Sequence, residues 1–321
     1  MNSDDKCKAD PFDSAYGGSG WAPRIRSLKQ EKGQFWSHFG INSEWKRLRS
    51  VLLHRPGKEL AASIDPQKVQ MLAALNVPKA QTQHASIGEA YQNAGVTVHY
   101  VDPPITPSPN QMFIADLMFM TPEGAILARP ASEVRAGEER WVSRRLADIG
   151  IPILRSISGK GVFEGADAMW LDKNSVMLAR GLRSNEEAVE QIRETLERMN
   201  VSSTLVDLPF GTMHLMGMLR IVDRDLAIAW PKRLSHRAVE ALRNRGYRVA
   251  WLPEGSEANQ NKAFNFVTLG PREILMSANC PQTQTFYESQ GIRCHTVAVD
   301  ELAKAAGGIG CLSGILERET E

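Results

Sequence analysis

The stretch Gly124-Ala125-Ile126-Leu127-Ala128-Arg129-Pro130 decides the fold, because a short apolar run ends there in a proline and a charged segment follows it. The run predicts a buried strand, and residues 133–149 predict a helix. Strands alternating with helices indicate an α/β fold rather than separate all-α and all-β domains. The same order recurs along the chain as a strand at 48–56, a helix at 86–94 and a strand at 96–101, then as strand–helix pairs at 175–180 with 185–199, 226–229 with 235–245, and 273–277 with 282–290.

The repeating unit is roughly 40–60 residues long and occurs about five times, which predicts an architecture of internal repeats. Residues 1–44 differ from it because they are polar, glycine-rich and dotted with aromatic side chains such as Tyr16, Trp21 and Trp36. Tryptophan side chains favour packing over exposure to solvent. We therefore expect residues 1–44 to form an N-terminal extension packed on a single domain, 45–321.

The composition excludes several classes of partner. The chain of 321 residues carries 38 basic and 37 acidic side chains, a net charge of +1, which leaves no electrostatic footprint for nucleic acid or an anionic membrane. No stretch approaches the ~18 apolar residues of a membrane-spanning helix, and the first residues do not resemble a signal peptide. We expect a cytoplasmic protein that binds neither nucleic acid nor membrane.

The cysteines are Cys7, Cys280, Cys294 and Cys311, too scattered for a disulfide framework or a zinc pattern. Cys311 stands apart because it ends the run Gly307-Gly308-Ile309-Gly310. A nucleophilic thiol must let a substrate carbon approach to about 3–3.5 Å, and glycines would allow a flat cation to lie against the sulfur. A buried thiol in a C-terminal turn fits the same residues.

Three carboxylates occupy similar contexts. Asp116 ends the apolar run Met112-Phe113-Ile114-Ala115, where it fits either a strand-end cap or a carboxylate directed into a cleft. Glu164 and Asp167 flank Gly165-Ala166, a pair that fits a tight turn or the close approach of a ligand.

His214 lies among methionines and leucine, which fits a core histidine as well as an acid–base group. Considered with Cys311, it supplies the partner that a nucleophilic thiol needs. Carboxylates in the same cleft would suit a planar cation with several N–H donors, such as a guanidinium.

In this order, four segments resemble the guanidino-modifying enzymes of the pentein superfold, which include dimethylarginine dimethylaminohydrolases, arginine deiminases and amidinotransferases. The segments are Phe-x-x-Asp at 113–116, Glu-Gly-x-Asp at 164–167, His-Leu at 214–215 and Gly-Gly-x-x-Cys at 307–311. The resemblance implies a five-bladed αβ propeller with pseudo-fivefold repeats and an active site on the central axis. The chain length favours the dimethylarginine-hydrolase-like members, because arginine deiminases usually carry an extra helical insertion.

The resemblance also implies roles. Cys311 would attack the guanidinium carbon, and His214 would protonate the leaving amine and then activate water. Asp116 and Glu164 would hold the guanidinium nitrogens, with Glu164 also orienting His214. Arg183 would hold a substrate carboxylate.

Four further positions complete the predicted substrate site. Arg129 would assist with the substrate carboxylate, and Asp167 would join the substrate-binding carboxylates. Asn110 stands where the family's dimethylarginine hydrolases carry Asp, and Ala115 stands where arginine deiminases carry Arg and bacterial dimethylarginine hydrolases carry Glu. Both departures from the family pattern predict that the substrate is not free methylated arginine. It would be a guanidine with a different tail or with a bulkier N-substituent.

The sequence therefore predicts a cysteine hydrolase that cleaves a C–N bond of a substituted guanidine through an S-amidino intermediate, without a metal or cofactor. An amidinotransferase that passes the amidino group to an amine remains open, as do an arginine dihydrolase or deiminase and a guanidine-binding protein without turnover. A homo-oligomer is compatible with the sequence.

Overall fold

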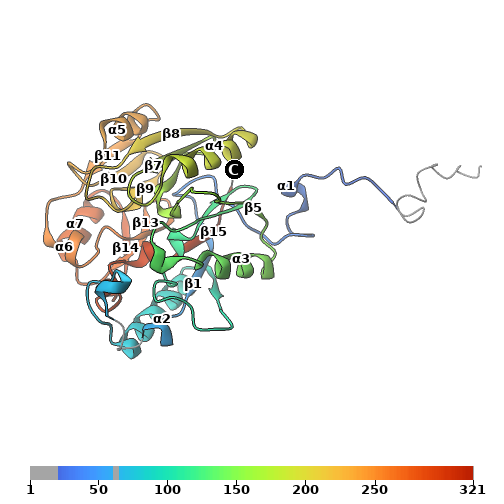
Figure 1. The fold of residues 1–321 in the computed structure, drawn as a ribbon. Coiled ribbons are helices and arrows are strands. Elements are labelled where there is room, and N and C mark those ends of the chain that lie inside the picture. The colour runs from blue at the N-terminus through green and yellow to red at the C-terminus, as the bar shows by residue number, and fades with distance from the viewer. Residues whose placement is uncertain (1–20, 61–64, 321) are drawn as a thin grey trace, which may run out of the picture.

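The computed structural model describes residues 21–60 and 65–320, and these residues form five three-stranded sheets (Figure 1). The strands are β1 (Leu48–His54), β2 (Thr97–Val101), β3 (Met118–Thr121), β4 (Gly124–Leu127), β5 (Ile153–Ser156), β6 (Ala168–Asp172), β7 (Ser175–Arg180), β8 (Ser202–Asp207), β9 (Leu219–Asp223), β10 (Leu226–Ala229), β11 (Arg248–Trp251), β12 (Val267–Gly270), β13 (Glu273–Ser277), β14 (Arg293–Val297) and β15 (Gly314–Arg318).

Each sheet has the same pairing pattern. The central strand pairs antiparallel with the strand that precedes it and parallel with the strand that follows its helix, as β7 does with β6 and β8. In the sheet of β1 the antiparallel partner is β15, and the parallel partner is β2. The C-terminal strand thus completes the first sheet and closes the ring. The predicted five-bladed αβ propeller is confirmed.

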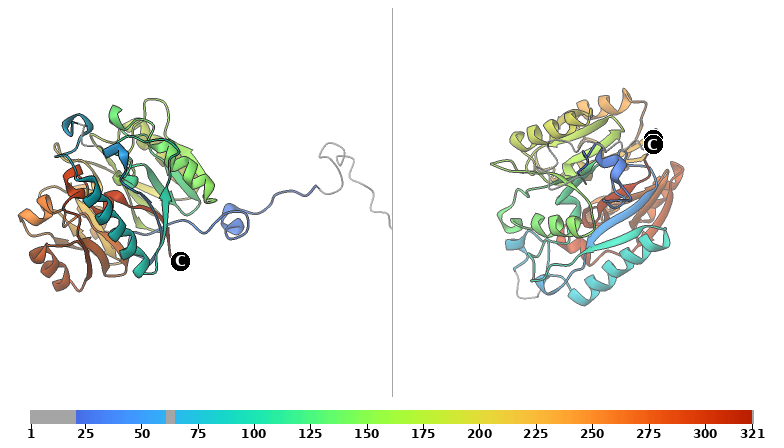
Figure 2. Two further views of the ribbon diagram at one scale, coloured as in Figure 1. Left: turned by 90° about the horizontal axis from the view of Figure 1, so that it is seen from below. Right: turned by 90° about the vertical axis from the view of Figure 1, so that its right-hand side faces the viewer.

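Helices connect the second and third strands of each repeat, and Figure 2 shows them on the outside of the ring of sheets. They are α2 (Val77–Asn93), α3 (Glu139–Asp148), α4 (Glu186–Arg198), α5 (His236–Arg243) and α7 (Pro281–Ser289), with α1 (Leu28–Glu31), α6 (Ser256–Gln260) and α8 (Ile309–Leu312) as short additions. Among the described helices, none has the length and apolar character needed to cross a membrane.

Two predicted helices differ clearly from the structure, whereas the ends of the other three lie within two residues of the prediction. The helix expected at 133–149 is divided into a 3₁₀ turn, Glu133–Arg135, and α3, because Gly137 between them has a φ of +89°. The helix expected at 86–94 starts earlier, at Val77, where the side chain of Asn76 caps it by accepting a hydrogen bond from a first-turn amide at 3.1 Å. The strands predicted at 175–180, 226–229 and 273–277 have the predicted boundaries.

The N-terminal segment contacts the domain in part. Phe39 is buried and Trp36 packs beside it against the cluster of apolar side chains around β3, β4 and α4, whereas Phe35 is 71% exposed. Tyr16 and Cys7, which the sequence placed in the extension, lie outside the described residues. The division of the chain at residue 45 stays a prediction.

Short turns precede the first strand of four of the repeats, and they determine where the side chains of the candidate site lie. They are Ile114–Asp116 before β3, Gly165–Asp167 before β6, Leu215–Gly217 before β9 and α8 before β15. Neighbouring turns contact one another. Side chains that are far apart in the sequence therefore meet at one end of the ring.

Candidate active site

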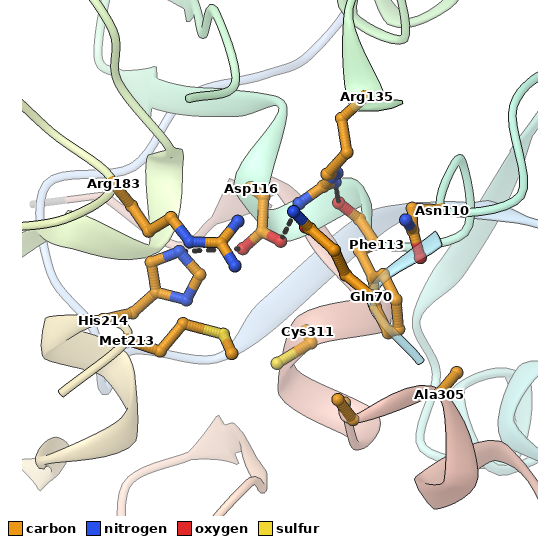
Figure 3. Close-up of a pocket in the computed structure, with 12 residues that line it drawn as sticks. Gln70, Asn110, Phe113, Asp116, Arg135, Arg183, Met213, His214, Ala305 and Cys311 are labelled. Carbon is orange, nitrogen blue, oxygen red and sulfur yellow. Dashed lines mark hydrogen bonds and ion pairs between the residues drawn. The ribbon is translucent and has the colours of Figure 1, made fainter. Parts of the chain in front are cut away.

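A pocket of about 390 Å³, open to solvent, lies where these turns meet (Figure 3). Asp116, Arg183, His214 and Cys311 line it, together with Asn110 at its edge. The structure thus brings together a thiol, an imidazole and a carboxylate that three different repeats supply. Glu164 lies directly behind them and is fully buried.

His214 is held by two carboxylates. Its Nε2 lies 2.6 Å from Glu164 Oε2 and 4.0 Å from Asp116 Oδ1, and all three side chains are buried. Burial disfavours the charged imidazole, but the negative charges of Asp116 and Glu164 outweigh it and raise the pKa of His214 to about 9. Burial likewise opposes the charge on Glu164, yet His214 and the nearby arginines lower the pKa of that carboxyl. The pair rests as imidazolium and carboxylate at neutral pH.

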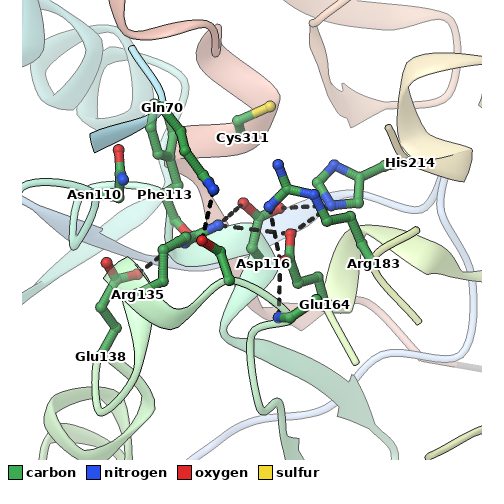
Figure 4. A network of polar contacts seen from close by, with 12 residues as sticks. Gln70, Asn110, Phe113, Asp116, Arg135, Glu138, Glu164, Arg183, His214 and Cys311 are labelled. Atoms are coloured by element: carbon green, nitrogen blue, oxygen red, sulfur yellow. Dashed lines mark hydrogen bonds and ion pairs between the residues drawn. The ribbon is translucent and has the colours of Figure 1, made fainter. Parts of the chain in front are cut away.

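Two arginines complete this polar network (Figure 4). Arg135 donates from Nη1 to Asp116 Oδ2 at 2.7 Å and from Nε to Glu138 Oε2 at 2.9 Å, and its side chain is 4% exposed. Arg183 donates to Glu164 Oε1 at 3.1 Å. Both cations are therefore paired with carboxylates of the protein before any ligand binds.

Asp116 keeps one oxygen for a further donor. Its Oδ2 accepts from Arg135, whereas its Oδ1 is buried and has no hydrogen-bond partner among the described residues. A buried carboxylate oxygen without a donor costs about 1–3 kcal/mol or more. Because Asp116 lines the pocket, a bound N–H donor can satisfy this oxygen.

Cys311 is positioned by Asn265, which reaches it from the turn before β12. Asn265 Nδ2 lies 2.9 Å from the sulfur, and Asn265 Oδ1 accepts from the backbone N–H of Cys311 at 3.0 Å. Burial and the charge of Asp116 raise the pKa of the thiol, while Asn265 and the cation of Arg220 act in the opposite direction. The free site therefore holds a thiol whose anion already has a donor in place.

The glycines before Cys311 make room for neighbouring side chains of the protein. A Cβ at residue 310 would lie 2.7 Å from Asn265 Oδ1 and closer still to the guanidinium of Arg220. A Cβ at residue 308 would lie 2.9 Å from Asn265 Cβ, and one at 307 would overlap the ring of Phe113. These glycines make room for Phe113, Asn265 and Arg220, and Gly307 also lines the pocket, so that close approach of a flat cation stays a prediction.

Asp167 and Asn110 have structural partners. Asp167 is fully buried, accepts from Ser184 Oγ at 2.6 Å and from the backbone N–H of Leu215 at 3.0 Å, and lies behind the pocket. Burial raises the pKa of Asp167 to about 6. Asp167 thus fixes the turn that carries the imidazole instead of facing a substrate. Asn110 lines the pocket while donating to Val69 O at 2.8 Å.

Arg129 and Ala115 do not lie where the sequence predicted. The guanidinium of Arg129 donates to Gly161 O at 2.9 Å, and this exposed residue follows β4 and does not line the pocket. Ala115 is 5% exposed and also lies outside the pocket, with its carbonyl packed against Gly165. Ala115 therefore does not enlarge the substrate site.

Sequence reasoning missed Asn265, Arg135 and Arg220. A signal for Asn265 was available, because Phe264-Asn265 precedes β12 as Phe163-Glu164 precedes the turn before β6. Comparing equivalent positions of the repeats would have found it. Arg135 and Arg220 carry no such signal, since arginines are spread over the whole chain.

The same cluster offers ligand atoms that a metal could use. One atom each from Asp116, Glu164 and His214 lie within 4.8 Å of one another. However, guanidinium groups at 2.7 Å and 3.1 Å already neutralise the two carboxylates. A metal ion would have to displace both, so the arrangement suits an organic cation better than a metal.

The similarities to known proteins agree with the fold and the pocket described above. A sequence profile of the family described as "N,N dimethylarginine dimethylhydrolase, eukaryotic" matches residues 64–313. The dimethylarginine dimethylaminohydrolase of Pseudomonas aeruginosa is 23% identical over 265 residues, which cover 83% of this chain and 98% of the relative.

Solved structures resemble the fold. The structure of the dimethylarginine dimethylaminohydrolase from Pseudomonas aeruginosa, a mutant complexed with citrulline, has a TM-score of 0.70 at 21% identity and covers 84% of this chain and 100% of its own. An amidinotransferase from Microseira wollei has a TM-score of 0.73 at 12% identity and covers 88% and 98%. These likenesses place the fold in the pentein superfold.

Proposed function

Because the chain belongs to the N,N dimethylarginine dimethylhydrolase family, it is a hydrolase of carbon–nitrogen bonds in guanidino compounds, and we propose that Cys311 carries the amidino group during the reaction. One observation carries the proposal. The buried Oδ1 of Asp116 has no donor among the described residues and lies in the pocket that Cys311 and His214 line. A guanidinium supplies the missing N–H donor.

In the first step the sulfur of Cys311 bonds to the guanidinium carbon. The bound cation favours the thiolate, because it adds a positive charge beside a thiol whose pKa burial has raised. The N–H of Asn265 stabilises the anion at 2.9 Å. The tetrahedral adduct then collapses as the C–N bond of one substituted nitrogen breaks.

His214 supplies the proton that this nitrogen needs. Its pKa of about 9 keeps it an imidazolium at neutral pH. Protonation lets the nitrogen leave as a neutral amine, and general acid catalysis of this kind contributes roughly 10²–10⁴-fold in rate. The site then holds an S-amidino cysteine and a neutral imidazole.

In the second step the neutral imidazole takes a proton from water, and the oxygen attacks the amidino carbon. The carbon–sulfur bond breaks, and the thiolate of Cys311 leaves a urea-type product. Glu164, at 2.6 Å from the ring, holds the imidazole in place and stabilises its charged form before and after this transfer.

The substrate class is a substituted guanidine. The Pseudomonas relative is named for dimethylarginine, and its mutant binds citrulline, a urea-type compound. Of the two departures that disfavoured methylated arginine, only Asn110 lines the pocket. Cytoplasmic location and homo-oligomer formation stay predictions.

Turnover in ¹⁸O-labelled water tests the proposal. Purified protein is incubated with a panel of guanidines that includes dimethylarginine, and the products are weighed by mass spectrometry. A hydrolase places one ¹⁸O in each molecule of urea-type product, and Cys311→Ser abolishes its formation. Transfer of the amidino group to an added amine, without ¹⁸O in the product, would establish an amidinotransferase instead. No turnover across the panel would favour a binding protein.

A further inference from the structure

A second chamber lies beside the active-site pocket and is not used by the reaction described above. It is open to solvent, has a volume of about 790 Å³ and shares Met213, His214, Ala306 and Cys311 with the first pocket. In Figure 3 the sulfur of Cys311 is on the side of Met213, one of the shared residues. A group bonded to the carbon at Cys311 can therefore extend into either space.

The second chamber carries uncompensated positive charge. Arg233 and Lys262 line it, and no aspartate or glutamate lies among its described lining residues. In the first pocket, by contrast, the arginines are paired with Asp116, Glu138 and Glu164. An anionic group would thus be stabilised more strongly by the cations of the second chamber than by those of the first pocket.

Lys262 is held close to the nucleophile. Its Cβ lies 3.0 Å from the position that a Cβ on Gly308 would take, three residues before Cys311. Burial lowers the pKa of Lys262, and its charge interacts with the sulfur of Cys311. A partly desolvated cation attracts an anion more strongly than one in water.

The remaining walls are apolar or aromatic. The guanidinium carbon of Arg233 lies 4.3 Å from the ring centre of Trp230, so its planar group is held by stacking. Phe264, Met216 and Met218 line the same space. Aromatic rings and thioethers pack well against a planar apolar body.

We propose that the second chamber receives an acidic N-substituent of the guanidine, with a carboxylate bound by Arg233 and Lys262 and an apolar body packed against Trp230. This inference rests on the proposed function, because it concerns the nitrogen that leaves. The substituent departs as an amino acid-like amine, and the rest of the guanidine remains in the first pocket as the urea-type product.

The chemistry balances. With R in the first pocket and R′ in the second, R–NH–C(NH₂)⁺–NH–R′ and water give R–NH–CO–NH₂ and R′–NH₃⁺. The sulfur–carbon bond forms and breaks once, the bond from carbon to the R′ nitrogen breaks, and the two protons gained by that nitrogen come from His214 and from water.

The test measures binding and turnover separately. Binding of 4-(aminomethyl)benzoate and 4-(aminomethyl)benzamide, which differ in charge but hardly in shape, is measured by calorimetry. The benzoate should bind about tenfold or more tightly than the benzamide, the range of a hydrogen bond to a charged group. That ratio should fall toward one in Lys262→Met and in Arg233→Gln. Lys232→Met, which removes an exposed lysine paired with Glu254 outside the chamber, should keep it.

Turnover is measured with N-butyl-N′-(4-carboxybenzyl)guanidine and its carbamoyl counterpart. The acid should have the higher kcat/KM, and the same two variants should remove the preference. Equal binding of the two amines, or a preference that survives both chamber variants and disappears in Arg183→Gln, overturns the inference. A charge-dependent binding that the chamber variants remove, with no guanidine hydrolysed, would leave the chamber in place and overturn the proposed function.

Discussion

Glu164→Gln is the substitution that separates charge from shape at the catalytic histidine. The glutamine keeps the volume and one oxygen that can accept from the Arg183 guanidinium, which lies 3.1 Å from the carboxylate. The NH₂ group of the glutamine then faces His214 Nε2, which lies 2.6 Å from the carboxylate oxygen of Glu164 in the wild type. This NH₂ group needs a hydrogen-bond acceptor, so it requires Nε2 without a proton. Both the lost charge and the new donor favour the neutral imidazole.

The size of the effect follows from the raised pKa. The pKa of His214 is about 9 against an ordinary 6.5, and Asp116 at 4.0 Å and the buried Asp167 are the carboxylates that remain. We expect the pKa to fall by about 2 units, to about 7. At pH 8 the protonated fraction would drop from about 90% to about 10%. Loss of the acid alone then lowers kcat about tenfold at pH 8 and much less at pH 6.

The assay combines NMR titration with a pH–rate profile. The sequence has seven histidines, and His214→Gln identifies the resonance of His214. Glu138→Gln is the matched control, because it removes another buried carboxylate of the network that contacts Arg135 instead of the imidazole. A pKa of His214 below 7 in the wild type, or one that Glu164→Gln leaves unchanged, would refute this reasoning.

The raised pKa of His214 also makes the stability of the folded protein depend on pH. Because the pKa of His214 is raised on folding, its protonation stabilises the folded state. This contribution is fully present below about pH 6.5 and is lost as the pH rises through about 9. Its size is at most about 3 kcal/mol, since each pKa unit corresponds to 1.36 kcal/mol. Urea unfolding of wild type and His214→Gln should converge as the pH rises from 7 to 10.

Two further substitutions test other parts of the site. Gly310→Ala places a Cβ against Arg220 and should lower kcat/KM at least a hundredfold, because it displaces the groups that hold the thiol. The control is Gly255→Ala, which has open space at its Cβ and should match wild type in activity and thermal unfolding. Arg183→Gln should raise KM about tenfold for substrates that carry a carboxylate tail in the first pocket, while Arg129→Gln, outside the pocket, should stay within about twofold of wild type. Equal effects of the two arginine variants in steady-state kinetics would contradict the placement of the pocket.

The repeats made the fold predictable from sequence. Apolar strands such as Ser175–Arg180 are short, buried on both faces and followed by a capped helix, so that local pattern and tertiary structure agree. The division of the helix at 133–149 was harder to predict, because Gly137 is a single residue in a charged run.

The parts of the site that were easiest to predict are the scarce residue types. A lone histidine and a cysteine after glycines are conspicuous, and the structure places His214 and Cys311 in one pocket. Arginines are common, so the sequence could not distinguish the exposed Arg129, which follows β4, from Arg135, which is buried between carboxylates. The glycines before Cys311 were conspicuous in the sequence, but the side chains that pack against them come from other repeats and could not be predicted.

The S-amidino adduct on Cys311 is the most direct test of the proposed chemistry. Protein is mixed with a guanidine substrate, quenched in acid and weighed intact. We predict an amidino mass increase on wild type that accumulates further in His214→Gly, where no imidazole activates water, and that is absent in Cys311→Ser. Turnover of the guanidine by Cys311→Ser at the wild-type rate, or the absence of any adduct on both wild type and His214→Gly during turnover, would contradict the covalent role of Cys311.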